Sequence, residues 1–379
     1  MKILLKGYYG FGNLGDDILM LVSFNLLKSL YPQAEITVFS NNSINNKDAN
    51  TREGYNKYIN SILRQEVKII DWTYRGHFDL IFHGGGGVYF DNKKGPVLYN
   101  AINRIIKWFG INSINKLDLI IRQITGKQQR IKYERKIGVG IGVGPFHRSS
   151  KLFYQKVAEL GSFSYMNVRD QFSYDLLSSL KFKQKLNIST DLSFHTELWI
   201  THQTIAPINR DRSKIGIILK GRTEKIHIHY KNLAKDLENQ GITVQFFAFD
   251  ENYDLDYIDR MKPEYDVNIW EPHKNTIDGY MKELWTCSIC ITDRAHGAML
   301  GAIGNVIPLI IRTSRKSDQV QNILNLDNAL SMVGYNKFYK LDDIIKVQND
   351  QENLSAKIQH IVQNNKKVIN MNINSMVSI

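Results

Sequence analysis

Short apolar runs alternate along the chain with stretches in which apolar residues recur at helical spacing. That alternation is typical of an α/β protein whose parallel strands are joined by helices. In the first half, the apolar runs predict strands at residues 1–6, 35–39, 79–82, 136–143, 165–168 and 186–189. In the second half, they predict strands at residues 215–219, 243–249, 267–270, 287–291 and 306–311. The pattern therefore predicts two successive α/β halves.

The two halves predict two domains. At 379 residues the chain is long for one domain and comfortable for two. A polar stretch at 197–212 contains Pro207 and is the expected boundary. We expect an N-terminal domain over 1–200, a C-terminal domain over 210–345, and a C-terminal helix with a frayed tail over 350–379.

The strand predicted at 287–291 leads into a candidate anion site. Its apolar residues alternate with small polar ones, which predicts a half-buried strand. Arg294, His296 and Gly297 follow at the start of a predicted helix. A helix N-terminus favours negative charge, and an arginine offers a planar fork to a carboxylate or a phosphate. Histidine can move a proton near neutral pH, so the site combines anion binding with a proton donor.

A glycine-rich turn joins the first predicted strand to the first helix. Gly10, Gly12 and Gly15 satisfy the G-x-G-x-x-G pattern of dinucleotide-binding proteins. That class needs an acidic residue at the end of the second strand, where this chain has Ser40 and two asparagines, so NAD and FAD are disfavoured. The polar side chains at this helix start are Asn13, Asp16 and Asp17. They are candidate cleft residues, and the alternative is a tight turn that Asp16 caps.

Other charged or glycine-rich segments also follow predicted strands. Four glycines in a row follow His83, as expected where something approaches the backbone closely. Ligands of parallel sheets bind outside the carboxyl ends of the strands, so we expect these ends to line a cleft. The remaining candidates of this kind are Gly85, Gly86, Asp91, Arg169, Lys220, Arg222 and Lys316.

The formal net charge of +12 suggests an anionic partner such as a phosphate substrate, a nucleic acid or a membrane surface. A soluble protein with many lysines is the equally simple alternative. Nucleic acid is disfavoured because the basic residues are spread over both halves and no nucleic-acid-binding module is recognisable. No apolar stretch of about 18 residues and no signal peptide are visible, so we expect a cytoplasmic protein.

Two residue pairs with metal or redox spacing have simpler explanations. Cys287 and Cys290 are spaced C-x-x-C but lie within the predicted strand, and two cysteines alone do not form a structural zinc site. We expect both to be core residues. His227 and His229 have no third ligand nearby in the sequence, so we expect them at the surface. No metal site is predicted.

Residues 101–135 form a basic insertion. Two stretches of helical spacing, around Ile105 and around Leu117, carry apolar faces flanked by lysines and arginines. Before Glu134 the only acidic residue is Asp118. Basic amphipathic helices of this kind often lie on anionic membranes. The alternative is that these faces pack on the protein itself or on a second copy of it.

Four segments together resemble the polysaccharide pyruvyl transferase family. They are Gly7 to Asp17, the glycine run after His83, Val168-Arg169-Asp170, and Arg294-Ala295-His296-Gly297, in the family's order over about residues 1–320. The resemblance implies two facing Rossmann-like domains, as in glycosyltransferases of the two-domain B type. It also implies phosphoenolpyruvate as co-substrate, with no metal or other cofactor. The product would be a cyclic pyruvate ketal on two neighbouring hydroxyls of a sugar, with phosphate released.

The resemblance also implies roles for individual residues. Arg169 and Arg294 would bind the donor's carboxylate and phosphate, with Ala295 and Gly297 beside them, and His296 would be the acid/base. A further basic residue is expected one strand later, where Lys316 is the candidate and Arg315 its competitor. The family usually has leucine at the position of Ala295 and serine at that of Asn167. Both departures could reshape the pocket without removing a charge.

The leading hypothesis is therefore a pyruvyl transferase of surface polysaccharide assembly. The basic insertion suggests a lipid-linked saccharide acceptor and a peripheral position at the inner face of the membrane. The first alternative is a B-type glycosyltransferase that uses a nucleotide sugar, with Asp250 or Glu251 contacting the ribose. The second alternative is a non-catalytic protein that binds a saccharide or nucleic acid.

Overall fold

A computed structural model describes the chain except residues 41–48, 92–104, 107, 125–130, 147–150, 201–210, 221–223, 314, 327–331, 334–336 and 378–379. The described chain divides into two compact units. Unit 1 comprises Met1–Gly10, Leu19–Leu192 and Val368–Ile379, and unit 2 comprises Phe11–Ile18 and Ser193–Lys367. The glycine-rich turn predicted for the N-terminal half therefore lies largely in unit 2.

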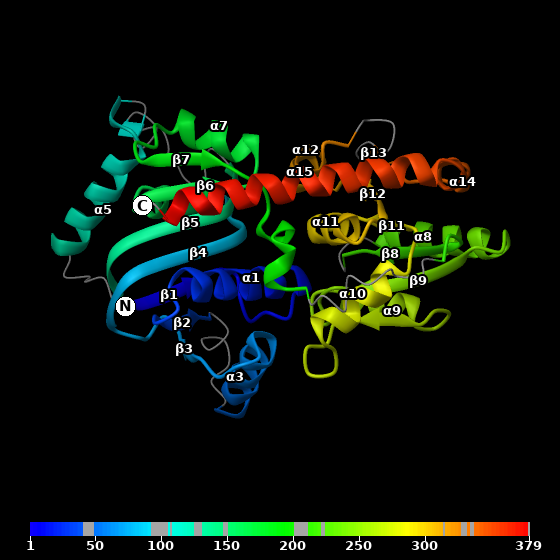
Figure 1. Cartoon of the computed structure of the whole chain (residues 1–379), viewed down its shortest axis with the longest axis horizontal. Coiled ribbons are helices and arrows are strands. Elements are labelled where there is room, and N and C mark those ends of the chain that lie inside the picture. The colour runs from blue at the N-terminus through cyan, green and yellow to red at the C-terminus, as the bar shows by residue number, and fades with distance from the viewer. Residues whose placement is uncertain are drawn as a thin grey trace. The chain divides into compact units, whose positions relative to one another are not determined.

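Unit 1 is a parallel sheet with helices in the connections (Figure 1). Its strands are β1 (Lys2–Lys6), β2 (Glu35–Phe39), β3 (Lys68–Ile70), β4 (Gly76–Asp91), β5 (Ile131–Phe146), β6 (Tyr165–Val168) and β7 (Lys185–Ile188). Its helices are α1 (Leu14–Leu30), which begins in unit 2, α3 (Ala49–Leu63), α5 (Ile111–Ile124), α6 (Lys151–Leu160) and α7 (Gln171–Ser179). The strand order is β3-β2-β1-β4-β5-β6-β7.

Unit 2 repeats this plan. Two short 3-10 turns, η1 (Leu192–Phe194) and η2 (Thr196–Leu198), lead into it. Its strands are β8 (Lys214–Ile218), β9 (Thr243–Ala248), β10 (Val267–Ile269), β11 (Ile289–Thr292), β12 (Ile307–Ile311) and β13 (Met332–Val333). Its helices are α8 (Glu224–Glu238), α9 (Leu255–Met261), α10 (Ile277–Trp285), α11 (Ala295–Ile303), α12 (Arg315–Leu324), α14 (Leu341–Asn349) and α15 (Gln351–Val377), which ends in unit 1.

The strand order in unit 2 fixes where a ligand is expected. The sheet reads β10-β9-β8-β11-β12-β13, with every pair parallel, so the order reverses between β8 and β11. Both sheets are doubly wound, which is the Rossmann-like arrangement that the sequence predicts. In such sheets the crevice at the reversal is where ligands bind. The ends of β8 and β11 carry Lys220 and Arg294.

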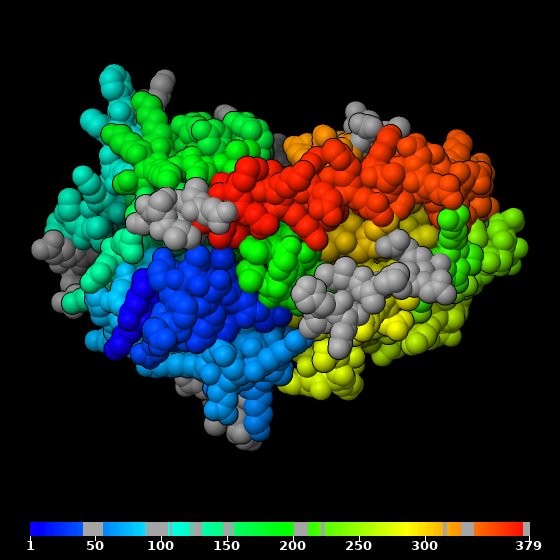
Figure 2. Space-filling model, viewed as in Figure 1, coloured from blue at the N-terminus to red at the C-terminus, as the bar shows by residue number. Residues whose placement is uncertain are grey.

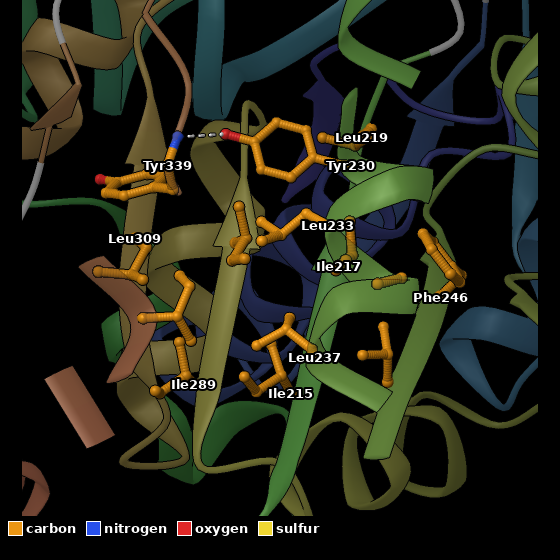
Figure 3. Close-up of a cluster of buried hydrophobic side chains, with 14 of the residues drawn as sticks. Ile215, Ile217, Leu219, Tyr230, Leu233, Leu237, Phe246, Ile289, Leu309 and Tyr339 are labelled. Atoms are coloured by element: carbon orange, nitrogen blue, oxygen red, sulfur yellow. Dashed lines mark hydrogen bonds between the residues drawn. The ribbon is translucent and has the colours of Figure 1, made fainter. Parts of the chain in front are cut away.

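A continuous apolar core holds the sheet of unit 2 to its helices. Ile215 and Ile217 of β8 pack with Leu233 and Leu237 of α8, and all four are buried (Figure 3). Burying side chains of this size stabilises by roughly 1.5–3 kcal/mol each. At the margin of the cluster, the backbone N–H of Tyr339 donates to the Tyr230 hydroxyl at 3.2 Å, which satisfies a buried polar group. The core thus fixes β8 in the middle of the sheet.

The prediction that β11 is half-buried is wrong. All four residues of β11 are buried, because the strand lies between β8 and β12 in a sheet that helices cover. Cys290 and Thr292, the small or polar members of the alternation, therefore lie in the interior as well. Both Cys287 and Cys290 are buried free thiols, as predicted.

Three elements are longer than predicted. β4 continues through His83 and the four glycines to Asp91, because it pairs with β5 along that length. β5 begins at Ile131, so the last residues of the predicted insertion are strand. α15 extends to Val377, where a frayed tail was expected, because buried apolar residues recur at helical spacing as far as Ile369 and Ile373.

Candidate active site

Arg294 and His296 lie where the sequence predicts them, at the junction of β11 and α11. Arg294 is the N-cap of α11, and its backbone N–H donates to the Thr292 hydroxyl at 3.0 Å. A Cβ atom at Gly297 would lie 2.4 Å from that hydroxyl. Glycine is therefore required for the tight connection from strand to helix. The motif thus places the Arg294 guanidinium and the His296 imidazole at the strand end, and Gly297 allows the helix to begin directly after the strand.

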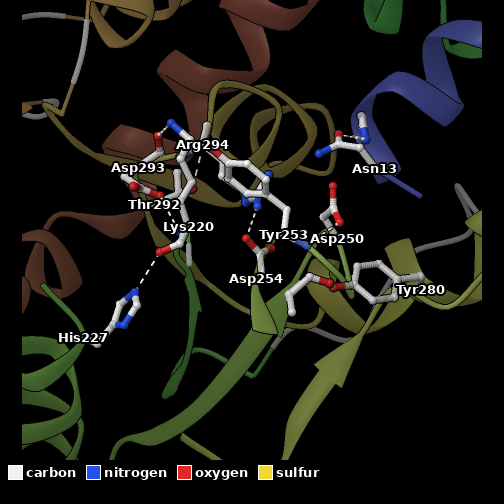
Figure 4. Close-up of polar contacts among 12 residues, drawn as sticks. Asn13, Lys220, His227, Asp250, Tyr253, Asp254, Tyr280, Thr292, Asp293 and Arg294 are labelled. Atoms are coloured by element: carbon white, nitrogen blue, oxygen red, sulfur yellow. Dashed lines mark hydrogen bonds and ion pairs between the residues drawn. The ribbon is translucent and has the colours of Figure 1, made fainter. Parts of the chain in front are cut away.

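Acidic side chains surround Arg294. Its guanidinium forms a buried ion pair with Asp254, which precedes α9 (Figure 4). The Tyr253 ring centroid lies 6.0 Å from the guanidinium carbon. Among the described residues, no hydrogen-bond partner faces Arg294 Nε, although the side chain is only 8% exposed. Asp254 thus orients the guanidinium on one edge and leaves Nε available to an anion.

Asp254 has an unusual charge environment. Burial raises the pKa of Asp254 to about 6, and the nearby Asp250 and Asp293 charges add to that rise, while Arg294 opposes it. Burial also raises the pKa of Asp250. The three carboxyl groups are thus gathered around a single guanidinium. Because the Asp254 carboxyl takes up its proton near pH 6, the charge at this site is sensitive to pH.

The segment from Asn13 to Ile18 belongs to the same site. Asn13 forms an isolated antiparallel bridge with Asp250, and the backbone N–H of Leu14 donates to the Phe249 carbonyl at 2.9 Å. The indole N–H of Trp270 donates to a carboxylate oxygen of Asp17 at 2.8 Å. Asp17 is fully buried. These contacts hold the start of α1 against the carboxyl end of β9.

Asn13 caps α1, and the alternative in which Asp16 caps the turn remains a prediction. The Asn13 side-chain oxygen accepts from the backbone N–H of Gly15 at 3.1 Å and from that of Asp16 at 3.4 Å. An amide suits this position because its carbonyl reaches the unpaired N–H groups of the first turn. Asp16 is half-buried in that turn.

Gly15 and His296 are in close contact. A Cβ atom built on Gly15 would lie 2.0 Å from His296 Nδ1 and 2.3 Å from its Cγ. The imidazole therefore rests on the first turn of α1 as well as on the first turn of α11. Two helix N-termini, each with a partial positive charge, meet at the half-buried His296 beside Arg294. That arrangement suits a negatively charged ligand and a proton transfer next to it.

Lys220 lies just after the end of β8, the strand that pairs with β11. Its backbone N–H donates to an Asp293 carboxylate oxygen at 3.0 Å, and its ammonium donates to the Asp293 carbonyl at 2.9 Å. The Lys220 carbonyl lies 2.7 Å from His227 Nε2 (Figure 4). Lys220 thus ties the end of β8 to that of β11, and its predicted place in a ligand cleft remains a prediction.

The prediction that His227 and His229 lie at the surface is wrong for His227, which is 1% exposed. It lies in the first turn of α8, which begins at Glu224, and is among the buried residues of that helix. Burial lowers the pKa of His227. His229 contacts the Tyr339 carbonyl at 2.8 Å. Within the described residues, no group of three or more His, Cys, Asp or Glu is placed to hold a metal ion.

Arg169 lies in unit 1 and is 3% exposed. Its Nη1 lies 3.0 Å from Asp191, and its Nε lies 3.6 Å from Asp170. Asp170 also caps α7 by accepting from the Ser173 backbone N–H at 2.7 Å. A Cβ atom at Gly142 would lie 2.8 Å from Arg169 Nε, so glycine makes room for the side chain. The local ion pair exists, and the donor-binding role of Arg169 remains a prediction.

The other predicted cleft residues are placed only in part. Gly85 and Gly86 lie within β4, with φ of 55° and 85°, which other residues adopt at a cost. Asp91 ends β4 and Lys316 lies in the first turn of α12, but their side chains are outside the described residues, as is the whole of Arg222. Their predicted roles remain predictions.

Two features were not predicted from the sequence. One is the pairing of Asp254 with Arg294, for which the clue was the acidic run Asp250, Glu251 and Asp254 after β9. The other is a polar cluster in unit 1, where Lys136 contacts Glu159 at 3.3 Å and Tyr89 contacts His83 at 3.2 Å. Burial, followed by the Lys136 charge, lowers the pKa of His83 well below its usual value.

Comparison with known protein families identifies the family to which the chain belongs. The model of the family described as polysaccharide pyruvyl transferase matches residues 13–314, which include Arg169, Arg294 and His296. The chain belongs to the polysaccharide pyruvyl transferase family. It is accordingly a transferase of polysaccharide biosynthesis, and the matched range contains the segments that carry the resemblance except for residues 7–12 of the first one. No curated protein matches the chain in sequence.

The solved structures that share the fold of this pyruvyl transferase are distant from it in sequence. The UDP-GlcNAc 2-epimerase from Neisseria meningitidis, bound to UDP-GlcNAc, shares 11% identity at a TM-score of 0.53, with all of both chains covered. The UDP-GlcNAc 2-epimerase from Methanocaldococcus jannaschii shares 10% identity at a TM-score of 0.52, with 93% of each chain covered. These likenesses confirm the expected architecture, two Rossmann-like domains as in B-type glycosyltransferases, and bear on the fold alone.

Proposed function

We propose that the protein transfers the enolpyruvyl-derived group of phosphoenolpyruvate onto two hydroxyls of a sugar, forming a cyclic pyruvate ketal. Family membership supports the pyruvyl transfer. The observation that carries the donor assignment is the joint placement of Arg294 and His296 where two helix N-termini meet. Phosphoenolpyruvate has a carboxylate, a phosphate and a carbon that must be protonated, and this site supplies groups of the matching chemistry.

Each group has a defined task in the proposed reaction. Arg294, oriented by Asp254, binds an anionic oxygen of the donor through its available edge. His296 delivers a proton to the methylene carbon as the first sugar hydroxyl attacks the neighbouring carbon. The second hydroxyl then displaces phosphate from that carbon. Of the two hydroxyl protons, one ends on the new methyl group and the other leaves with phosphate, so the reaction balances without a redox step.

The magnitudes are ordinary for these groups. A charge-assisted hydrogen bond from Arg294 contributes about 1.5–3 kcal/mol. General acid catalysis by His296 contributes about 10²–10⁴-fold. The two helix N-termini each add about 0.3–1 kcal/mol for an anion.

We further propose that the acceptor is a lipid-linked saccharide of a capsule or exopolysaccharide, and that the protein works peripherally at the inner face of the membrane. The basic, apolar segment around α5 supports this location. Among the described helices, none is both long and apolar enough to cross a bilayer.

The test is transfer of radiolabel from [¹⁴C]phosphoenolpyruvate to a lipid-extractable saccharide fraction, with phosphate release measured in parallel. Label and phosphate should appear in equal amounts. His296→Ala should bind phosphoenolpyruvate with unchanged affinity and lose turnover by about 10²-fold or more. Unchanged turnover in His296→Ala would remove the assigned role. Phosphate release without labelled saccharide would show a phosphatase rather than a transferase.

A second candidate is a B-type glycosyltransferase that uses a nucleotide sugar. The observation in its favour is the acidic pair after β9, since Asp250 and Glu251 could contact a ribose. Asp250, however, already accepts from the Tyr253 backbone N–H at 2.8 Å and bridges to Asn13. Turnover with a UDP-sugar and none with phosphoenolpyruvate would select this candidate.

A further inference from the structure

Exposed apolar side chains are concentrated in one short stretch of unit 1. Of the sixteen large apolar residues that are exposed in the described chain, seven lie between positions 108 and 124. They are Trp108, Phe109, Leu117, Leu119, Ile120, Ile121 and Ile124. Trp108 is 76% exposed and Ile124 is 79% exposed. We call these seven residues the α5 surface. A concentration of this kind marks an interaction site rather than ordinary surface variation.

The first half of α5 is fixed to unit 1. Ile111 and Ile114 are fully buried in a core that includes residues of α6. The Ile111 backbone N–H donates to the Leu180 carbonyl at 3.0 Å, and the Asn112 side chain donates to the Gly161 carbonyl at 3.1 Å. The helix is therefore anchored at one end, and its position does not depend on the exposed residues that follow.

The second half of α5 presents its apolar residues outward. Leu117, Ile120 and Ile124 recur three and four residues apart, so they share one helix face. All three are exposed. In Figure 1 this half of α5 extends beyond the strands of its own sheet, and Figure 2 shows its cyan to teal side chains on the molecular surface. The stripe continues the helix face of Ile114, which is buried, into a part of α5 whose apolar side chains are exposed.

The sequence around the α5 surface is strongly basic. Residues 101–133 contain seven lysines and arginines and a single acidic residue, Asp118. Among the described side chains, Lys116 on α5 and Lys132 at the start of β5 are exposed. A wide apolar face flanked by positive charge is the composition of a helix that lies in the interface of an anionic bilayer. An exposed tryptophan is also typical of that interface.

A second copy of the chain fits this surface less well. Self-association through the same face would bring two copies of the basic segment together, and like charges oppose that contact. An anionic bilayer supplies both the apolar layer and the opposite charge. We propose that the α5 surface inserts into the headgroup region of an anionic lipid bilayer. This inference deepens the peripheral location given under the proposed function and rests on the same segment, but it does not depend on the identity of the donor.

The experiment is cosedimentation of the full chain with vesicles of phosphatidylglycerol and phosphatidylcholine, and with vesicles of phosphatidylcholine alone. The wild type should bind the anionic vesicles at least tenfold more tightly than the neutral ones. Ile120→Ser/Ile124→Ser should lose at least tenfold in affinity for anionic vesicles. The matched control is Ile228→Ser/Met371→Ser, which changes two similarly exposed apolar residues on other helices and should lose less than twofold.

Equal vesicle affinity of the wild type and Ile120→Ser/Ile124→Ser would overturn the proposal. A second outcome would also overturn it: the wild type binds no vesicles and is a dimer in sedimentation equilibrium, whereas Ile120→Ser/Ile124→Ser is a monomer. The α5 surface would then be a contact between two copies of the chain. Thermal unfolding of each variant checks that it is folded. Because no donor or acceptor is present, a failure here leaves phosphoenolpyruvate binding unchanged, and failure of the proposed reaction leaves vesicle binding unchanged.

Discussion

Replacing Gly15 with alanine should displace His296. Gly15 is the second residue of α1, and its backbone is helical, so alanine by itself would fit the local conformation. The new methyl group would lie 2.0 Å from His296 Nδ1, whereas ordinary contacts begin at 3.4 Å. The ring must therefore retreat by about 1.4 Å, which is the difference between those two distances.

The effects on stability and on turnover should differ in size. Alanine is favoured over glycine in a helix by about 0.5–1 kcal/mol. Overpacking costs about 1–3 kcal/mol. The free energy of unfolding should thus fall by no more than about 2.5 kcal/mol, and the protein should stay folded. A displacement of about 1 Å at a reacting group can cost about 10²-fold in rate, so the loss of turnover should be the larger effect.

The assay follows the His296 imidazole by NMR in protein labelled at its ten histidines. The resonance that disappears in His296→Ala identifies this ring. Gly15→Ala should shift that resonance, and Gly279→Ala should not, because a Cβ there meets only the Thr276 hydroxyl at 3.1 Å. An unshifted His296 resonance in Gly15→Ala, together with wild-type turnover, would refute the packing of His296 against α1.

Three further predictions concern buried groups. Burial raises the pKa of Asp254 to about 6, so the folded state binds the extra proton between about pH 4 and 6, and the wild type loses stability as pH rises through that window. Asp254→Asn lacks this titration, so in urea unfolding the difference in free energy of unfolding between variant and wild type should move in the variant's favour by roughly 3 kcal/mol from pH 4 to pH 7. Arg294→Met should lower the free energy of unfolding by about 3–5 kcal/mol, because it leaves Asp254 without its ion-pair partner. Adding Asp254→Asn to that variant should recover most of the lost stability, and losses that simply add in the double variant would contradict the pairing. Because burial raises the pKa of Cys287 to about 12 and that of Cys290 further still, neither thiol should react with a disulfide reagent at pH 8 until the protein is denatured.

The sequence was sufficient to locate the strand end that carries Arg294 and His296. A short apolar run, a change to polar residues and a run of small residues are local signals, and the strand and helix formed where those signals lie. The glycine at 297 also had a local cause, the close approach to Thr292. Local patterns of this kind can be read without knowing the rest of the fold.

The partners of Arg294 could not be predicted in the same way. Asp254 precedes it by 40 residues, and Asn13 lies more than two hundred residues from Asp250. No periodicity links such positions, because they meet only through the order of strands in the sheet. The same limit applies to β11, whose burial depends on its two neighbouring strands rather than on its own alternation.

Calorimetric titration of the protein with phosphoenolpyruvate and, separately, with UDP-GlcNAc would show which donor the site containing Arg294 and His296 binds. We expect phosphoenolpyruvate to bind and UDP-GlcNAc not to bind. Binding should be lost in Arg294→Met/Asp254→Asn, which removes the guanidinium without leaving a buried carboxylate unpaired. Binding of UDP-GlcNAc in place of phosphoenolpyruvate, or phosphoenolpyruvate binding that survives in this variant, would show that Arg294 does not bind the proposed donor.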